Sequence, residues 1–498
     1  NMKKIMCLAA VFSFCAALAV SAKPAADSPP PSGPGPLVTG PVKGGEMGYP
    51  FGAYFGDIRG IGYIEEEYFL EGTAVRYAPV NELKNDGKWD IEPVSSAPYK
   101  TRILVRRPRD PAKFNGTVLV EWTNVSFGFE YNLVDTRGLY TNGFAYVSVS
   151  AQPTGIDGFP SLPQGLNAWD NERYGSLNIP DEAVSFDIFT QAARAVGPNR
   201  RAESHGVDPM GGMAVKKLIA TGASQSGTRI LAYTNGVQPL SNAFDAIIPV
   251  ICAGTASDFA SGLAHPDSGS GNTGHSRSVS TWVREDLSIP VLQFNSQTEA
   301  LYFANQRQPD TDKYRSWEIA GASHMPNRMT GASRKIWERD GMIDPTRTFW
   351  DISRMNEVDW HNAFDAALLH VHRWINGGSP PPQMPPIQVE GRDYAYDQYG
   401  NVQGGVRMPE MEVPIGRYVA GPIYPLIGYT VPFSPERLRQ LYPTHEAYVA
   451  KITAAANAAK DAGIILPEAV DEYIQAANRA PVPEALPVEV KMDPRISR

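Results

Sequence analysis

The sequence predicts an α/β fold in which helices cover a mostly parallel central sheet. Three observations carry this prediction. Short apolar segments rich in β-branched residues recur along the chain, segments with helical spacing separate them, and one strand-like segment runs into a sharp turn rich in glycine and serine. Such alternation is typical of a parallel sheet with right-handed crossovers.

Seven segments are expected to form the strands of this sheet. Each is short and largely apolar, as strands buried on both faces are. They are residues 101–106, 116–122, 144–150, 217–221, 246–252, 290–294 and 316–320.

Residues 359–376 give the clearest helical pattern. Their apolar side chains repeat near the 3.6-residue period, and Gly377 and Gly378 end the helix before a run of prolines. Further helical patterns occupy residues 181–196, where Asp181 is the expected N-cap, residues 229–233 directly after the turn, and much of residues 434–478.

The N-terminus has the pattern of a signal peptide over residues 1–22, because Lys3 and Lys4 precede an apolar stretch that small residues end. A Pro- and Gly-rich tether is predicted at 23–43, and one α/β domain at 44–498. That domain carries lid-like insertions at 151–215, 253–288 and 325–358 and a C-terminal extension at 391–498. We therefore expect export to the periplasm or the medium, with no stable membrane anchor after cleavage.

Composition narrows the class of protein further. A net charge of -8, without a basic run, argues against binding to nucleic acid. Beyond the predicted signal peptide Cys252 is the single cysteine, so no internal disulfide is expected. Cys252 lies in an apolar run, which favours a buried structural thiol over a nucleophile. The oligomeric state is left open by the sequence.

The turn at residues 222–227, Gly-Ala-Ser-Gln-Ser-Gly, predicts a nucleophile elbow with Ser224 as the nucleophile. A serine presented on a tight strand-to-helix turn needs small residues two positions before and after it. Gly222 and Ser226 meet this requirement for Ser224. Ser226 as nucleophile would have the β-branched Thr228 as a flank, so steric crowding favours Ser224.

The partners of Ser224 should follow in the chain order acid, then histidine. His324 lies in a small-residue loop after the last predicted strand, where it can reach the elbow and act as the general base. Glu299 is the first carboxylate after the preceding strand and is the predicted acid. Asp258, after the strand before that, is the alternative.

Two backbone N–H groups are needed to stabilise an oxyanion. One is expected from Gln225, directly after the nucleophile. The other is expected from the loop after residues 116–122, where Asn124 is the candidate, with Thr123 and Val125 as alternatives. The histidine pattern predicts no metal site. His370 and His372, two apart on a helix, face different directions and cannot share an ion.

Several segments resemble the bacterial proteins known as "alpha/beta hydrolase domain" proteins, a group of serine hydrolases. They include Val-Glu-Trp-Thr-Asn-Val at 120–125, Val-Ser-Ala-Gln at 149–152, Arg-Tyr-Gly-Ser-Leu at 173–177, the Ser224 elbow and Gly-Gly-Val-Arg-Met-Pro at 404–409. The elbow is also similar to the Gly-x-Ser-Gln-Gly-Gly turn of some acetyl esterases, with Ser226 in place of a glycine.

The resemblance implies the α/β-hydrolase fold and a C-terminal extension that belongs to the family unit. It also implies hydrolysis of small carboxylic esters through a serine, an acid and a histidine, without a metal or an organic cofactor. Some similar enzymes open lactones, so the lactone subclass is included. An acyltransferase or a peptidase with the same three residues is an alternative, as is a hydrolase-like binding protein without activity.

Overall fold

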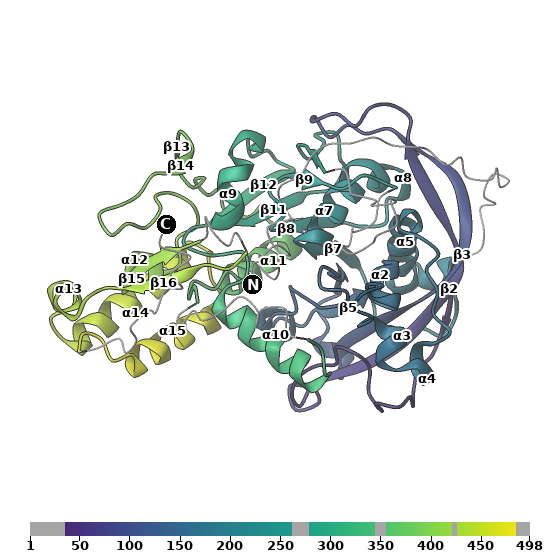
Figure 1. Ribbon diagram of the computed structural model, residues 1–498, viewed down its shortest axis with the longest axis horizontal. Coiled ribbons are helices and arrows are strands. Elements are labelled where there is room, and N and C mark those ends of the chain that lie inside the picture. Colours follow the sequence, from purple (N-terminus) through teal and green to yellow (C-terminus); the bar gives the residue numbers. More distant parts are fainter. Residues whose placement is uncertain (1–34, 261–277, 344–354, 421–425, 485–498) are drawn as a thin grey trace.

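The computed structural model describes residues 35–260, 278–343, 355–420 and 426–484 (Figure 1). The predicted signal peptide and the tether up to residue 34 lie outside these residues, so export stays a prediction. In the described part of the chain no helix combines the length and the apolar character needed to cross a membrane.

Six parallel strands form one side of a ten-stranded sheet among the described residues, beginning at its β12 edge. In sheet order they are β12 (Tyr314–Ile319), β11 (Val291–Ser296), β8 (Ala246–Val250), β7 (Lys217–Ala223), β4 (Thr117–Trp122) and β5 (Ala145–Val149). They coincide with six of the predicted strands. The chain passes from β4 to β5 on one side and then to β7 on the other side of β4. The carboxyl ends of β4 and β7 therefore flank the switch point at which α/β proteins bind ligands.

The seventh predicted strand belongs to an antiparallel extension of this sheet. Residues 101–106 lie in β3 (Ile91–Pro108), which pairs antiparallel with β5 and with β2 (Tyr63–Pro79). The short strands β1 (Leu37–Thr39) and β6 (His205–Gly206) complete that edge. The long β2–β3 ribbon stands at the right of Figure 1. The sheet is thus parallel from β12 to β5 and mainly antiparallel beyond β5. β2 was not expected, and β1 lies within the segment predicted as a tether.

Helices cover both faces of β4. Thr117 and Glu121 share one face, because side chains alternate along a strand, and Thr117 Oγ1 lies 2.8 Å from Nδ1 of His372 in α11 (His361–Ile375). Trp122 points to the other face, where its ring packs 5.4 Å from that of Phe186 in α5 (Ser185–Val196). Residues 181–184, with Asp181 as N-cap, form a 3₁₀ turn before α5.

The predicted insertions supply mostly short helices. Residues 151–215 contain α2 (Pro153–Asp157), α3 (Leu166–Trp169), α4 (Asn171–Tyr174), α5 and α6 (Arg200–Glu203), and residues 325–358 contain α10 (Asn327–Arg339). Residues 253–288 contain the short strands β9 (Thr255–Ala256) and β10 (Val279–Ser280). The other helices before α11 are α1 (Arg137–Thr141), α7 (Gln225–Ala232), α8 (Gln238–Ser241) and α9 (Gln297–Phe303).

The C-terminal extension packs on the edge of the sheet at β12. Val406 accepts a hydrogen bond from the N–H of Ala320 and donates one to the carbonyl of Glu318. The extension forms β13 (Val389–Glu390), β14 (Asp393–Tyr394), α12 (Pro409–Glu412), β15 (Gly416–Val419), β16 (Tyr429–Pro432), α13 (Pro435–Leu441), α14 (His445–Asp461) and α15 (Pro467–Arg479). In Figure 1 α13, α14 and α15 lie on the side opposite the β2–β3 ribbon. Val406 and Met411 lie in the main hydrophobic core, so the extension shares that core.

Cys252 is buried after β8 and forms no disulfide. Burial raises the pKa of its thiol to about 12, which keeps the sulfur protonated and poorly nucleophilic at neutral pH. This environment matches the expectation of a structural thiol.

Candidate active site

Ser224 lies at the junction of β7 and α7 in a backbone conformation that residues other than glycine rarely adopt. Its φ is 61° and its ψ is -120°, and its N–H donates to the carbonyl of Val250. A non-glycine residue in this region is strained, and such strain persists only where the surroundings hold it in place. The strand-to-helix turn therefore presents Ser224 as a nucleophile elbow does.

Close packing explains why the flanks of this turn are small. A Cβ atom on Gly222 would lie 2.8 Å from both Cγ1 of Ile230 and the carbonyl oxygen of Ser226. A Cβ atom on Gly227 would lie 2.5 Å from the carbonyl oxygen of Val250. Both distances are too short for real contacts, so the turn requires glycine at these positions.

The side chain of Ser226 stabilises the backbone of the turn. Its side chain is fully buried, and its Oγ donates to the carbonyl of Ala223 and accepts from the N–H of Ala223, both at 3.0 Å. The hydroxyl of Ser226 is thus committed to the backbone, which leaves Ser224 as the serine with access to the site.

The structure brings the three sequence-predicted side chains together. His324 Nε2 lies 2.8 Å from Ser224 Oγ, and His324 Nδ1 lies 2.6 Å from Oε1 of Glu299. The loop after β12 holds the imidazole in place, because the N–H of His324 donates to Oγ1 of Thr298 and its carbonyl accepts from Nε1 of Trp360. The chain order and the hydrogen bonds are those of a serine–histidine–acid triad.

Glu299 has a second task at the start of α9. Its Oε2 accepts from the N–H and the Oγ of Ser296 at 2.8 and 2.6 Å, which completes a capping box. The Ser-x-x-Glu pattern at 296–299 is a readable signal for this arrangement. The alternative acid, Asp258, instead accepts from the N–H of Ala260, and it is Glu299 that contacts His324.

The N–H groups of Gln225 and Val125 are the candidate oxyanion donors that the backbone hydrogen bonds leave available. Gln225 is the first residue of α7, where a backbone N–H has no acceptor within the helix. The N–H of Val125 points at the same residue, since it donates to Oε1 of Gln225 over a long 3.4 Å. A bond of that length is weak and easily exchanged for a better acceptor.

Asn124, the candidate second donor, is engaged elsewhere. Its N–H donates to the carbonyl of Tyr131, and its Nδ2 donates to the carbonyl of Ala223 at 2.9 Å. The N–H of Thr123 likewise donates to the carbonyl of Val149. The role expected of Asn124 is therefore better suited to its neighbour Val125, and Asn124 ties the loop to the elbow.

Sequence comparison adds an independent observation. Residues 38–475 match the family described as "Alpha/beta hydrolase domain". The chain belongs to the alpha/beta hydrolase domain family. This match confirms the predicted family and fold. No curated protein sequence matches the chain at a significant level.

Solved structures similar to this alpha/beta hydrolase domain protein include two glucuronoyl esterases. The enzyme from Solibacter usitatus is 10% identical, with 59% of this chain and 82% of that chain covered and a TM-score of 0.27. The CE15 enzyme from Teredinibacter turnerae is 13% identical, with 61% and 80% covered and a TM-score of 0.28. A serine hydrolase without a lid from Xanthomonas campestris is 11% identical, with 51% and 91% covered and a TM-score of 0.27. Similarity this low says nothing about the substrate of this chain.

A buried amide network connects Trp122, at the end of β4, with Gln225 in this alpha/beta hydrolase domain protein, and sequence reasoning missed it. Oε1 of Gln152, in the loop after β5, accepts from Nε1 of Trp122 and from Nε2 of Gln225, both at 2.9 Å. Its Nε2 donates to Glu182 at 3.0 Å. Gln152 was noted only within a family motif, because an isolated glutamine carries no spacing signal.

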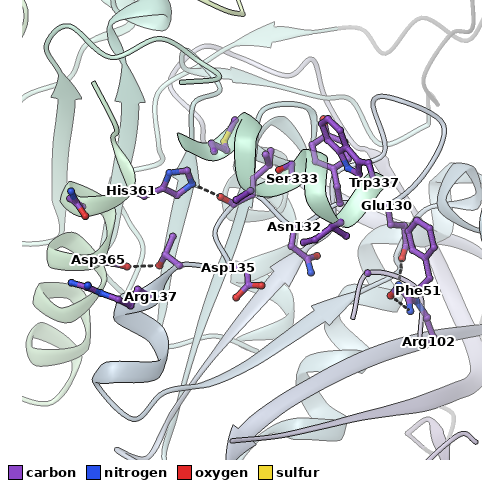
Figure 2. A pocket seen from close by; sticks show the side chains of 18 residues that line it. Phe51, Arg102, Glu130, Asn132, Asp135, Arg137, Ser333, Trp337, His361 and Asp365 are labelled. Atoms are coloured by element: carbon purple, nitrogen blue, oxygen red, sulfur yellow. Dashed lines mark hydrogen bonds and ion pairs between the residues drawn. The ribbon is translucent and has the colours of Figure 1, made fainter. Parts of the chain in front are cut away.

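The structure also contains a pocket of about 240 Å³, and none of Ser224, Glu299 and His324 lines it (Figure 2). Its walls are the loop at residues 130–137, one face of α10 and the first turn of α11. Phe51, Gly52 and Arg102 close the remaining side. The predicted insertion at 325–358 thus forms part of the pocket through α10.

Glu121 is buried beneath the loop at residues 130–137. Tyr146 donates its hydroxyl to Oε2 of Glu121, and the N–H of Leu133 donates to Oε1 at 2.8 Å. Burial raises the pKa of Glu121 to about 7. The folded state therefore binds a proton more tightly than the unfolded chain, whose glutamates titrate near 4.3.

This shift predicts a pH-dependent loss of stability. The contribution of Glu121 is fully present below the unfolded pKa and is lost as the pH rises to about 7. Glu121→Gln should therefore reduce the decline in the free energy of unfolding between pH 5 and pH 8 by about 2–3 kcal/mol. Urea denaturation at several pH values measures this, with exposed Glu82→Gln as the control. Parallel pH profiles for wild type and Glu121→Gln would contradict it.

Proposed function

We propose that the protein hydrolyses small carboxylic esters through an acyl-enzyme formed on Ser224. The observation that carries the proposal is the pair of short contacts, 2.8 Å from Ser224 Oγ to His324 Nε2 and 2.6 Å from His324 Nδ1 to Glu299. The strained backbone of Ser224 supports it, since strain of this kind is found at nucleophile elbows.

In the first half-reaction neutral His324 accepts the hydroxyl proton of Ser224 at Nε2 while Oγ attacks the ester carbonyl carbon. Glu299 accepts the Nδ1–H of His324, which fixes the tautomer and stabilises the imidazolium that forms. The tetrahedral intermediate then collapses, the bond to the alcohol oxygen breaks, and His324 returns the proton to that oxygen. In the second half-reaction water, with His324 as base, releases the acid and restores Ser224.

The developing oxyanion accepts hydrogen bonds from the N–H groups of Gln225 and Val125. Val125 exchanges its long bond to the Gln225 side chain for this stronger acceptor. Gln225 lies at the N-terminus of α7, where the helix dipole adds favourable potential for negative charge. Every step is carried by side-chain and backbone groups of this chain.

A substrate screen tests the proposed reaction. Purified protein is incubated with p-nitrophenyl acetate, longer p-nitrophenyl esters, a lactone and p-nitroacetanilide, with and without an added alcohol acceptor. We expect free acid from the esters, little cleavage of the amide, and no dominant transfer to the alcohol. Faster amide cleavage would identify a peptidase, and acyl transfer as the main product would identify a transferase. No turnover of any compound would favour a hydrolase-like binding protein.

The amide network predicts a defect confined to the chemical step. Gln152→Ala removes the oxygen that holds Trp122 and Gln225 on the two sides of the hole. We expect kcat to fall about 10- to 100-fold with little change in KM, less than loss of a donor itself. Steady-state kinetics measures this, and exposed Gln440→Ala is the matched control. A rise in KM at unchanged kcat would mean that Gln152 does not position the oxyanion hole.

A further inference from the structure

We propose that the pocket of Figure 2 binds one side of the ester and selects a neutral, ring-sized group that carries a hydrogen-bonding oxygen. This inference rests on the proposed ester hydrolysis and deepens it. Three features of the pocket carry it: the contacts that connect its walls to the elbow and to His324, the pairing of its charges, and two polar side chains with free hydrogen-bonding capacity.

The first feature is position. Tyr131, on one wall, exchanges both backbone hydrogen bonds with Asn124, whose side chain donates to the carbonyl of Ala223 beside Ser224. On the other wall, His361 stacks on Trp360 with ring centroids 4.0 Å apart. Trp360 in turn donates to the carbonyl of His324. Each wall thus contacts one residue, Asn124 or Trp360, that is itself hydrogen-bonded to the elbow or to His324.

The second feature is that each charged side chain of the lining pairs with another group of the protein, and Oε1 of Glu130 is the buried lining oxygen that accepts no hydrogen bond within the described residues. Arg102 contacts Glu67 and Glu130 at 2.7 and 2.9 Å, and His361 contacts Asp359 at 2.6 Å and the carbonyl of Leu133 at 3.0 Å. The remaining charges pair as Asp135 with Arg106, Arg137 with Glu472, and Asp365 with the hydroxyl of Thr136. A charged ligand would have to displace one of these partners, so the pocket favours a neutral group.

The third feature is the character of the surface that remains. Apolar side chains of Phe51, Leu133, Met329, Ile336 and Trp337 line most of the pocket. Within the part of the chain that the structure describes, the side chains of Asn132 and Ser333 make no hydrogen bond, and both line the cavity. In Figure 2 they face the cavity from the loop and from α10. An apolar site with a few free polar groups is typical of small-molecule recognition.

Volume sets the size of the group. A cavity of about 150 Å³ holds a benzene molecule in a protein core. A pocket of about 240 Å³ therefore admits a single aromatic or alicyclic ring with one or two substituents. It is too small for a long acyl chain coiled within it. The oxygen of a hydroxyl, methoxy or carbonyl substituent would pair with Asn132 or Ser333.

The test compares ring esters with a small reference ester. Wild-type protein is assayed with ethyl acetate, ethyl 4-hydroxybenzoate and 2-(4-hydroxyphenyl)ethyl acetate, so that the ring lies on either side of the ester and every leaving group is an alkyl alcohol. The same two ring esters without the hydroxyl are assayed beside them. We expect at least one ring ester to have the higher kcat/KM. Ser333→Phe fills the pocket and should lower the ratio of kcat/KM for that ester to kcat/KM for ethyl acetate about 10- to 100-fold. Lys335→Phe, exposed on the same helix and outside the pocket, should leave the ratio unchanged.

A smaller change separates shape from hydrogen bonding and guards against misfolding. Ser333→Ala and Asn132→Ala should lower the preference for the hydroxylated ring over the unsubstituted ring, and Tm should match the wild type. A ratio that Ser333→Phe leaves unchanged, with active enzyme, would overturn the pocket assignment alone. Wild-type protein that turns over no ester at all would overturn the proposed function itself.

Discussion

Replacing Ser224 by alanine is expected to lower kcat for ester hydrolysis by about 10⁴- to 10⁶-fold and to abolish labelling by a fluorophosphonate probe. The reason is that Ser224 Oγ is the atom that His324 Nε2 reaches at 2.8 Å. Without it no acyl-enzyme forms. Residual activity would come from direct attack of water on an ester whose carbonyl oxygen is held by the proposed oxyanion donors. Initial rates with p-nitrophenyl acetate and intact-protein mass spectrometry after labelling measure the two effects.

Ser226→Ala is the matched control. It removes the other hydroxyl of the same turn, which is bonded to the backbone of Ala223, and leaves Ser224 in place. This variant should still be labelled by the probe, with some loss of stability. Equal labelling of Ser224→Ala and the wild type would place the nucleophile elsewhere.

Glu299→Gln is expected to reduce kcat by about 10⁴-fold while leaving the fold intact. A carboxamide cannot stabilise the imidazolium of His324 and favours the wrong tautomer. Glutamine can still complete a capping box with Ser296, so α9 should retain its N-terminus. Steady-state kinetics and Tm separate the two roles. Glu299→Ala should lose both the contact with His324 and the capping of α9, so the free energy of unfolding should fall by about 1 kcal/mol in addition.

Asp258→Asn is the control for this second experiment, because Asp258 was the alternative acid. It should retain activity, since its carboxylate accepts from the N–H of Ala260. If Asp258→Asn abolished turnover while Glu299→Gln did not, the acid of the proposed triad would have to be reassigned.

The parallel strands could be predicted from the sequence, but β2 could not. Strands buried on both faces appear as short apolar runs, and six of these lie in the sheet as expected. β2 instead contains three successive glutamates at 65–67, which indicate an exposed segment. In the structure Glu67 is buried between Arg102 and Arg173, at 2.7 Å from each. Pairing of this kind depends on residues far apart in the chain.

The site was predictable to the extent that chain order determines it. Ser224, Glu299 and His324 occupy positions that the strand order of this fold specifies. The second oxyanion donor depends instead on which backbone N–H the loop leaves available. The N–H of Asn124 donates to the carbonyl of Tyr131, and no local pattern predicts the turn that brings these two residues together. Pocket residues such as Asn132 and Ser333 become neighbours only through the docking of α10.

The contact between the C-terminal extension and β12 orders events during synthesis of the chain. Val406 supplies both hydrogen bonds to the backbone on either side of Ile319, and the N–H of Met325 donates to the carbonyl of Leu426. His324 lies between these two anchors. A nascent chain that has emerged only to residue 390 already holds every proposed catalytic residue, yet its histidine loop lacks these partners. Activity should thus mature late, after residues 391–426 of the extension have been synthesised and have reached β12.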